Sequence, residues 1–450
     1  MKKLIKIAGI AALGLASSQS ARAQSSDSSK PWSVSATLRH FYDDNIFTAS
    51  QTALDAQGES LKRGSLGFDI IPDAHFNLNR GQTTLGLGYA YTLRYFQERP
   101  DEKIDQAHDA NLKLTHEFTS RLRLEIHDSL VIAQEPSVMD RNVITSPLRS
   151  EGNNLRNTGG ANVAFGVSES LELVADIGST LYDYEQDGSD PDLKNTSGNT
   201  IAPSRSALLD RTENSAGLNL RYQLLSETIG VLGYTFTSID YSSDEALNPL
   251  TPDFAKIYSK DRNNDRHNIF TGVDHTFTPK LNASVRVGGE MVEYSNASAA
   301  ATADTDSVSP YVDARLAYGY SKDDSIVVGV RHGYSQTDAG IYGQYLGLGN
   351  NTERLVLNAK TTSLYGQIGY HLTANISAKL NAQYQQSEFQ IADQSGLSDE
   401  YFIIGLSSAY KINRWFSLEA GYNYDVLEST FQAGREYDRN RVFVGVVAQY

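Results

Sequence analysis

Residues 83–96 read TTLGLGYAYTLRYF, and this stretch decides the class of fold that the sequence predicts. Every second residue is apolar or aromatic, while Gly, Ala, Thr and Arg94 stand between them. Successive side chains of a β-strand point to opposite faces, so the stretch predicts a strand with one apolar and one polar face. The apolar face would carry Leu85, Leu87, Tyr89, Tyr91, Leu93 and Tyr95.

The same alternation recurs at Trp32–Tyr42 and Leu281–Tyr294. In each stretch one face carries Leu, Val or aromatic residues, and the other carries Ser, Asn or charged residues. A soluble sandwich would bury the apolar face in a core. Charge on the opposite face over about ten residues is instead typical of a transmembrane barrel, with lipid outside and water inside.

The connections between such stretches alternate in length. Polar tight turns occur at Asn79–Gln82, Thr119–Arg121, Ser168–Ser170, Ser226–Thr228, Thr278–Lys280, Ser321–Asp324, Thr373–Asn375 and Asn413–Trp415. Longer polar connections lie between them, as at Gln134–Asn157, Glu185–Asp210, Ser242–Arg262 and Asp338–Glu353. The sequence therefore predicts an all-β fold, a transmembrane antiparallel β-barrel of about 18 strands over residues 32–450, with short periplasmic turns and long extracellular loops.

The first residues predict export from the cytoplasm. Lys2, Lys3 and Lys6 precede a short apolar run at residues 7–16, and Ala21-Arg22-Ala23 matches the small-x-small pattern of signal peptidase sites. We expect a signal peptide over residues 1–23, a short periplasmic segment over residues 24–31, and a location in the bacterial outer membrane. No Cys stands at the cleavage site, so a lipid anchor is not expected.

The charge and the absence of Cys exclude some classes of partner and of metal site. Removal of the four basic residues of the signal peptide takes the formal net charge from −15 to −19, which argues against nucleic acid as a partner. The chain has no Cys, so disulfides and thiolate metal sites are excluded. No apolar run approaches the roughly 18–20 residues of a transmembrane helix.

Aromatic residues gather beside the expected turns, as in the interfacial girdles of outer-membrane barrels. The girdle at the short turns would comprise Phe76, Phe118, Phe165, Tyr222, Phe277, Tyr320, Tyr370 and Tyr410. The opposite girdle would draw on Tyr42, Tyr95, Tyr241, Tyr334, Tyr384 and Tyr424. The chain ends in an alternating strand with Tyr450 last, which resembles the signal read by the barrel assembly machinery.

Polar residues on the inner face are candidates for lining a pore and setting its ion preference. They are Arg39, Asp69, Arg94, Asp109, Arg123, Glu125, Arg286, Glu290 and Arg331. Aromatic residues expected on the same face could stack on sugar rings: Phe41, Phe96, Tyr182, Phe270, Tyr365 and Phe443. One connection, Ala339–Gly349, is apolar and Gly-rich, so it would either fold inward and constrict the pore or extend a hairpin.

Catalytic and metal sites find little support. The nine His residues show no metal-ligand spacing, and we expect no catalytic residue, cofactor or metal. The alternative is an outer-membrane lipid hydrolase, which needs Ser, His and Asn or Asp together on the lipid-facing side; the sequence has no GxSxG motif. The loop Asp187–Asp192 offers alternating oxygen ligands for Ca²⁺, but a solvated acidic loop is favoured.

The segment Phe41–Phe47 reads FYDDNIF and ends the first expected strand. Asp43, Asp44 and Asn45 favour a turn by hydrogen-bonding their own backbone, and the flanking rings would lie at the upper interface. Tyr42, Asp43, Asn45, Ile46 and Phe47, with Asp44 at a variable position, resemble the signature of the putative β-barrel porin 2 family.

That family includes barrels associated with exopolysaccharide secretion, so the resemblance implies a pore and periplasmic polysaccharide-export proteins as partners. It implies no catalytic residue. We therefore expect a channel for polar solutes, with saccharide or exopolysaccharide as cargo and with lipid, lipopolysaccharide and the assembly machinery as further partners. A structural or receptor barrel plugged by its loops is the other alternative.

Overall fold

The computed structural model describes residues 31–54, 58–100, 102–134, 152–195, 197–295, 307–321, 324–343, 353–391, 394–431 and 434–450. The expected signal peptide, residues 1–23, lies outside the described residues, as does all of segment 24–31 except Pro31.

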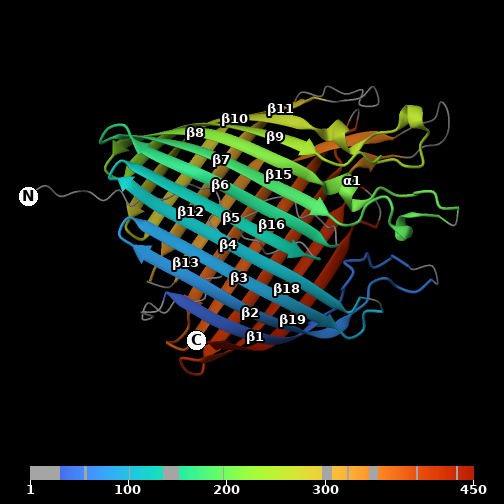
Figure 1. Cartoon of the computed structure of the whole chain (residues 1–450), viewed down its shortest axis with the longest axis horizontal. Helices are drawn as coiled ribbons and strands as arrows, with labels where there is room; N and C mark the ends of the chain where they lie inside the picture. Colours follow the sequence, from blue (N-terminus) through green and yellow to red (C-terminus); the bar gives the residue numbers. More distant parts are fainter. Residues whose placement is uncertain are drawn as a thin grey trace, which may run out of the picture.

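The strands form one closed antiparallel barrel (Figure 1). Each strand pairs with its neighbours in sequence, and β1 pairs with both β2 and β19, which closes the wall. Of the 19 strands in the described ranges, the two-residue β14 pairs only with the end of β15, so 18 make up the wall, as predicted.

The bounds of the strands follow the predicted alternation, and β3 and β11 coincide with the predicted stretches. The strands are β1 Trp32–Asp43, β2 Ser65–Arg80, β3 Thr83–Phe96, β4 Ile104–Thr119, β5 Leu122–Ala133, β6 Asn154–Gly166, β7 Leu171–Tyr184, β8 Arg211–Leu225, β9 Thr228–Tyr241, β10 Asn264–Thr278, β11 Leu281–Tyr294, β12 Ser307–Gly319, β13 Ser325–Ser335, β14 Ile341–Tyr342, β15 Arg354–His371, β16 Ile376–Ile391, β17 Ser398–Lys411, β18 Phe416–Ser429 and β19 Tyr437–Gln449.

The few helical turns lie in the long connections. The α-helix α1 spans Arg205–Leu209, and the 3₁₀ turns are η1 Pro191–Leu193, η2 Asp253–Ala255 and η3 Ser259–Arg262. None of the helices in the described ranges has the length and apolar character needed to cross a membrane.

All eight predicted tight turns join consecutive strands at one end of the barrel. Five of these turns share one hydrogen-bond pattern. A side-chain oxygen of the first turn residue accepts the backbone N–H groups two and three positions later, and these bonds replace ladder bonds at the bend. The acceptors are Thr119, Ser168, Thr278, Thr373 and Asn413. The nine longer connections lie at the other end, here called the long-loop end (Figure 1).

The two faces of the wall differ as predicted. Leu38 is 58% exposed on the outside of the barrel, whereas the preceding Thr37, which points inward, is 1% exposed. Residues of the expected girdle at the short turns, such as Phe118, Phe277 and Tyr370, are exposed on the outer face. Two members of the opposite girdle were predicted wrongly: Tyr241 and Tyr334 are buried.

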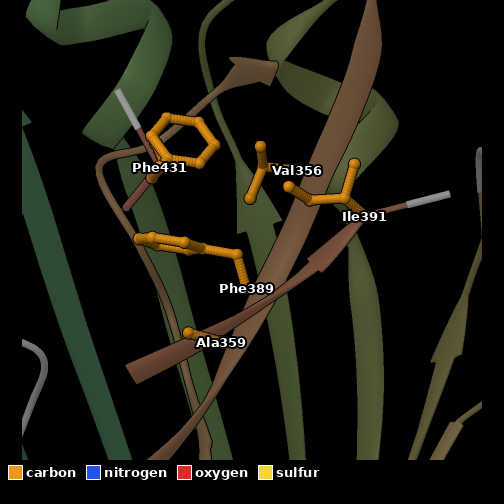
Figure 2. Close-up of a cluster of buried hydrophobic side chains, with 6 residues drawn as sticks. Val356, Ala359, Phe389, Ile391 and Phe431 are labelled. Atoms are coloured by element: carbon orange, nitrogen blue, oxygen red, sulfur yellow. The ribbon is translucent and has the colours of Figure 1, made fainter. Parts of the chain in front are cut away.

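Apolar clusters occupy the inside of the wall at the long-loop end, and Figure 2 shows one of them. Phe389 and Ile391 at the end of β16 pack with Val356 and Ala359 of β15 and with Phe431 of the β18–β19 connection. Burial there follows from sequence, because the inward positions of β16 change from Gln383 and Gln385 to Phe389 and Ile391. On β15 and β16 the inside of the wall is thus polar lower down and apolar near the long loops.

The apolar connection after β13 contributes to these clusters. Ala339 packs with Val356, Phe389 and Phe431, and Ile341 and Tyr342 form β14 opposite Leu355 and Arg354. The described part of this connection therefore combines the two predicted arrangements, since it is a short hairpin whose apolar side chains turn inward. Its residues 344–349 lie outside the described part of the chain.

Candidate functional site

A row of charged side chains crosses the inner face of the wall. Strand pairing sets Arg39 of β1 opposite Asp69 of β2, which lies opposite Arg94 of β3. Arg94 Nε donates to Asp69 Oδ1 at 2.9 Å, and Arg39 Nη1 lies 3.8 Å from Asp69 Oδ2. Asp69 is 1% exposed, so its buried carboxylate depends on the two guanidinium groups for compensation.

The row continues across β19 to β18. Arg39 Nη2 donates to Glu419 Oε1 at 2.9 Å, although β19 lies between the two strands. The residue of β19 opposite both is Gly445, whose missing side chain leaves the guanidinium room to pass. Three predicted pore residues, Arg39, Asp69 and Arg94, are therefore brought together, and Glu419 joins them.

Aromatic rings support this row from the long-loop side. The Arg39 guanidinium lies 4.2 Å from the centroid of Phe443, and that of Arg94 lies 5.3 Å from the centroid of Phe41. Phe41 and Phe96 meet edge to face at 5.3 Å. The ring faces attract the cations and hold the guanidinium planes in place.

A second charged cluster lies farther round the wall, on β8 to β11. Arg286 Nη2 donates to Asp274 Oδ1 at 2.7 Å, and Arg221 Nη2 donates to Asp274 Oδ2 at 3.4 Å. Gly272 lies opposite Arg286 and has no side chain to obstruct it. Both clusters thus place one buried carboxylate between two arginines, which sets donors and acceptors side by side along the wall.

The remaining predicted pore residues lie apart from these two clusters. Glu125 pairs with Lys113 at 3.2 Å, Asp109 is exposed, and Arg123 is half-buried on β5. Arg331 is exposed opposite Asp313, which in turn lies opposite Arg286. Glu290 is buried, and its role is described below.

The predicted turn after β1 is confirmed, and Asn45 organises it. Asp43 Oδ1 accepts the Asn45 N–H at 2.9 Å. The Asn45 side chain donates from Nδ2 to the Ala49 carbonyl and accepts the Ala49 N–H at Oδ1. The same amide donates to the Asp438 carbonyl of β19 at 2.9 Å, which ties the loop to the closing strand. Asn45 is therefore a structural residue of the motif.

The prediction that the flanking rings lie at the upper interface is wrong for Phe47. Ile46 is fully buried, and Phe47 packs with it against Phe41 and Phe96 inside the wall. Tyr42 is exposed on the outer face, as predicted. The turn folds its apolar residues inward because the Asn45 bonds draw the backbone over the end of the barrel.

Three long connections meet above the inner wall, and their described residues form what we call the loop cluster: residues 185–195, 197–210, 242–263, 336–343 and 353–356. Arg262 of η3 is fully buried at their junction. Its guanidinium donates to the Leu208 carbonyl of α1 at 2.9 Å and to the Thr337 carbonyl after β13. It also stacks over Tyr241 at 4.4 Å, and burial lowers the pKa of this guanidinium. One side chain thus links all three connections.

Further contacts hold the loop cluster together. Glu353 accepts from Asn248 Nδ2 at 2.8 Å and from Thr251 Oγ1 at 2.9 Å, and Ser204 Oγ donates to Glu245 at 2.7 Å. Apolar side chains of the same three connections pack below these bonds. They are Ala207, Leu208, Leu247, Ile257, Ile341 and Leu355. Sequence periodicity carries no signal for Ala207, Leu208, Leu247 and Ile257, because these four belong to no strand.

One Ser–His contact bears on the hydrolase alternative. Ser309 Oγ lies 3.3 Å from His332 Nε2, but Ser309 is fully buried and His332 Nδ1 faces the Thr362 hydroxyl at 2.8 Å. A hydrolytic site needs an accessible nucleophile and an acidic residue that orients the His. Here Ser309 is buried, and the Thr362 hydroxyl stands where the acid would be. Among the described residues no group of three or more His, Cys, Asp or Glu could hold a metal. In the acidic loop, the Asp187 carboxylate accepts the Ser189 N–H at 2.8 Å.

Comparison with known proteins agrees with the resemblance stated above. The family model described as "Putative beta-barrel porin 2" matches residues 359–450, which hold most of β15 and all of β16 to β19. The match confirms the family resemblance, but over the last strands rather than over Tyr42–Phe47. No curated protein matches the chain.

Solved structures of outer-membrane proteins also match. The outer membrane protein OpdK of Pseudomonas aeruginosa is 12% identical with a TM-score of 0.42, and the match covers 93% of this chain and 99% of that one. OccAB3 of Acinetobacter baumannii is 10% identical with a TM-score of 0.41, at 93% and 99% coverage. The chain is thus a closed 18-strand antiparallel β-barrel whose last strands resemble a porin family.

Proposed function

We propose that this barrel is an outer-membrane channel for polar solutes, with saccharides as the favoured class of cargo. The observation that carries the proposal is the charged row Glu419–Arg39–Asp69–Arg94 on the inner face. Charged pairs held on rigid strands offer donors and acceptors that replace part of a solute's hydration, while charge and width select among solutes. The other inward charges would extend this polar wall: Asp109, Arg123, Glu125, Arg286 and Arg331.

Neutral polar groups on β15 and β16 support a saccharide in particular. Ser363 Oγ donates to Gln385 Oε1 at 3.1 Å, and Gln383 Nε2 donates to the same oxygen at 3.3 Å. Ser363 and Gln385 are each 1% exposed, so the half-buried Gln383 would present this network to sugar hydroxyl groups. Export of an exopolysaccharide, with periplasmic export proteins as partners, rests on the family resemblance.

The loop cluster favours a second candidate, a receptor or structural barrel closed at the long-loop end. Arg262 and the apolar clusters fix three connections over the inner wall, which would narrow or close the path. In either case we place the long-loop end outside the cell, in contact with lipopolysaccharide, and the short turns in the periplasm.

Swelling of proteoliposomes in isotonic sugar solutions tests the channel. We expect uptake of mono- and disaccharides that declines as the oligosaccharide grows, because a lumen of fixed width excludes larger solutes. Folded barrel, recognised by its heat-modifiable gel mobility, that gives no swelling with any sugar would contradict the channel and favour the closed barrel.

A further inference from the structure

The wall of the barrel is split between β12 and β13 at the long-loop end. The ladder between these strands stops at the pair Val312 and His332. Yet β12 begins five positions earlier at Ser307, and β13 continues to Ser335. Over these residues β12 stays paired with β11 up to Ser307, and β13 stays paired with β15 up to Ser335. Each strand keeps its outer neighbour while the two part from each other.

Side chains replace the missing ladder. The Tyr334 N–H donates to Glu290 Oε2 at 2.8 Å, and Arg266 Nη1 donates to the Tyr334 carbonyl at 3.0 Å. Arg266 Nη1 itself lies 3.8 Å from Glu290 Oε1. These residues come from β11 and β10, so their side chains extend past β12 to satisfy the backbone of β13. Side-chain bonds of this kind can be exchanged without unwinding a strand.

Two further bridges close the split from side to side. Tyr334 Oη donates to Ser307 Oγ at 2.8 Å, and Ser309 Oγ lies 3.3 Å from His332 Nε2. Directly after Ser309, Pro310 interrupts the donors of β12, since proline has no N–H for a ladder. The sequence of β12 therefore opposes continued pairing with β13 at this level.

Apolar surface lies on both sides of the split. Outside, Val308 is 68% exposed and Met291 beside it faces outward as well. Inside, Val292 opposite Ser307 is fully buried, and Leu355, Leu357 and Tyr294 form the apolar cluster under the loop cluster. A hydrocarbon chain that crossed the wall here would leave one apolar surface and enter another, and the bridging hydroxyl and imidazole groups would face its polar head.

We propose that the split is a lateral opening, through which an amphipathic molecule with a single hydrocarbon chain moves between the inside of the barrel and the outer leaflet. The proposal rests on placement of the barrel in an outer membrane, but not on conduction along its axis. It assigns Tyr334 and His332 as the side chains that close the opening, and Glu290 and Arg266 as the groups that hold β13 in position.

Distances between spin labels across the wall test this opening, and the absence of Cys from the chain makes labelling specific. One pair, Val308→Cys with Lys360→Cys, spans the split from β12 to β15. A matched pair, Val308→Cys with Ile269→Cys, spans the same number of strands across the intact ladder from β12 to β10. Both pairs are measured in phospholipid bilayers with and without sodium laurate as the single-chain probe.

Laurate should widen the distance across the split by about one strand spacing, ~5 Å, and leave the matched pair unchanged. Tyr334→Phe, which loses the bond to Ser307, should broaden the distances across the split even without laurate. Unchanged distances at saturating laurate, or equal changes in both pairs, would overturn the lateral opening. Liposome swelling reports on the axial channel separately, so either proposal can fail alone.

Discussion

Arg39 Nη2 donates to Glu419 Oε1 at 2.9 Å across an intervening strand, and it does so over Gly445. A methyl group at Gly445 would lie 2.9 Å from the Leu38 carbonyl oxygen and 3.0 Å from Glu419 Oε1. This glycine is thus required by the close approach of a salt bridge, and its substitution tests the charged row directly.

Gly445→Ala should destabilise the barrel by about 1–2 kcal/mol, the scale of a charged hydrogen bond that is lost or strained. The measurement is unfolding of the detergent- or lipid-reconstituted barrel by urea, followed by gel mobility. Gly369→Ala is the matched control, because a methyl group there meets no atom within 4 Å. Equal losses in the two variants would mean that the Arg39–Glu419 approach contributes nothing specific.

Asp69→Asn should cost about 3 kcal/mol of stability, because it leaves Arg39 and Arg94 without their shared buried carboxylate. The loss of negative charge should also move the reversal potential toward anion selectivity. Asp109→Asn removes an exposed carboxylate on the same face, so we expect a selectivity change of the same sign without the large stability loss. A neutral effect of Asp69→Asn on stability would contradict the assigned geometry.

Arg262→Ala should loosen the loop cluster, since it removes the donors to Leu208 and Thr337 at once. The loss of about 1.5–3 kcal/mol of charged hydrogen bonding corresponds to ~10–100-fold faster amide exchange in α1. Lys260→Ala, two positions earlier and half-exposed, is the control. Unchanged exchange at residues 206–209 in Arg262→Ala would show that packing alone fixes the loops.

Asp210 should make the loop cluster sensitive to pH. Its carboxylate accepts from the Tyr184 N–H at 2.8 Å and from Ser206, and burial raises its pKa to about 6, helped by nearby Asp183 and Glu245. Because the folded-state pKa lies above the unfolded value, the stabilisation is complete below about pH 4 and is lost as pH rises through about 6.

Hydrogen exchange of α1 should therefore slow between pH 7 and pH 5, after correction for the intrinsic pH dependence of exchange. Asp210→Asn should abolish this change, because the amide does not titrate. A change of the same size in Asp210→Asn would assign the pH response to other groups.

Periodicity predicted the barrel because strands obey a local rule. The side on which Arg39, Asp69 and Arg94 lie follows from alternation, and the eight turns follow from short polar breaks. The loop cluster could not be predicted in this way, since Arg262 joins carbonyl groups far away in sequence. The wrong placement of Tyr241 and Tyr334 has the same origin. Alternation predicts the face of the wall on which a side chain lies, but not whether a loop or a split strand pair covers that side chain.

One signal of the split was present in the sequence. Pro310 lies inside a strand, where proline is confined to edges and irregular positions, so it marks a place where β12 lacks a regular partner. The identity of that partner, and the substitution of Glu290 and Arg266 for its ladder, depend on the three-dimensional arrangement of four strands.

The channel itself is tested most directly by single-channel conductance of the refolded barrel in a planar bilayer, with and without added oligosaccharides. An open polar lumen predicts steady conductance that oligosaccharides block transiently, and a larger conductance for Arg262→Ala. The absence of conductance in folded protein, with Arg262→Ala equally silent, would contradict the channel and leave a barrel closed at its long-loop end.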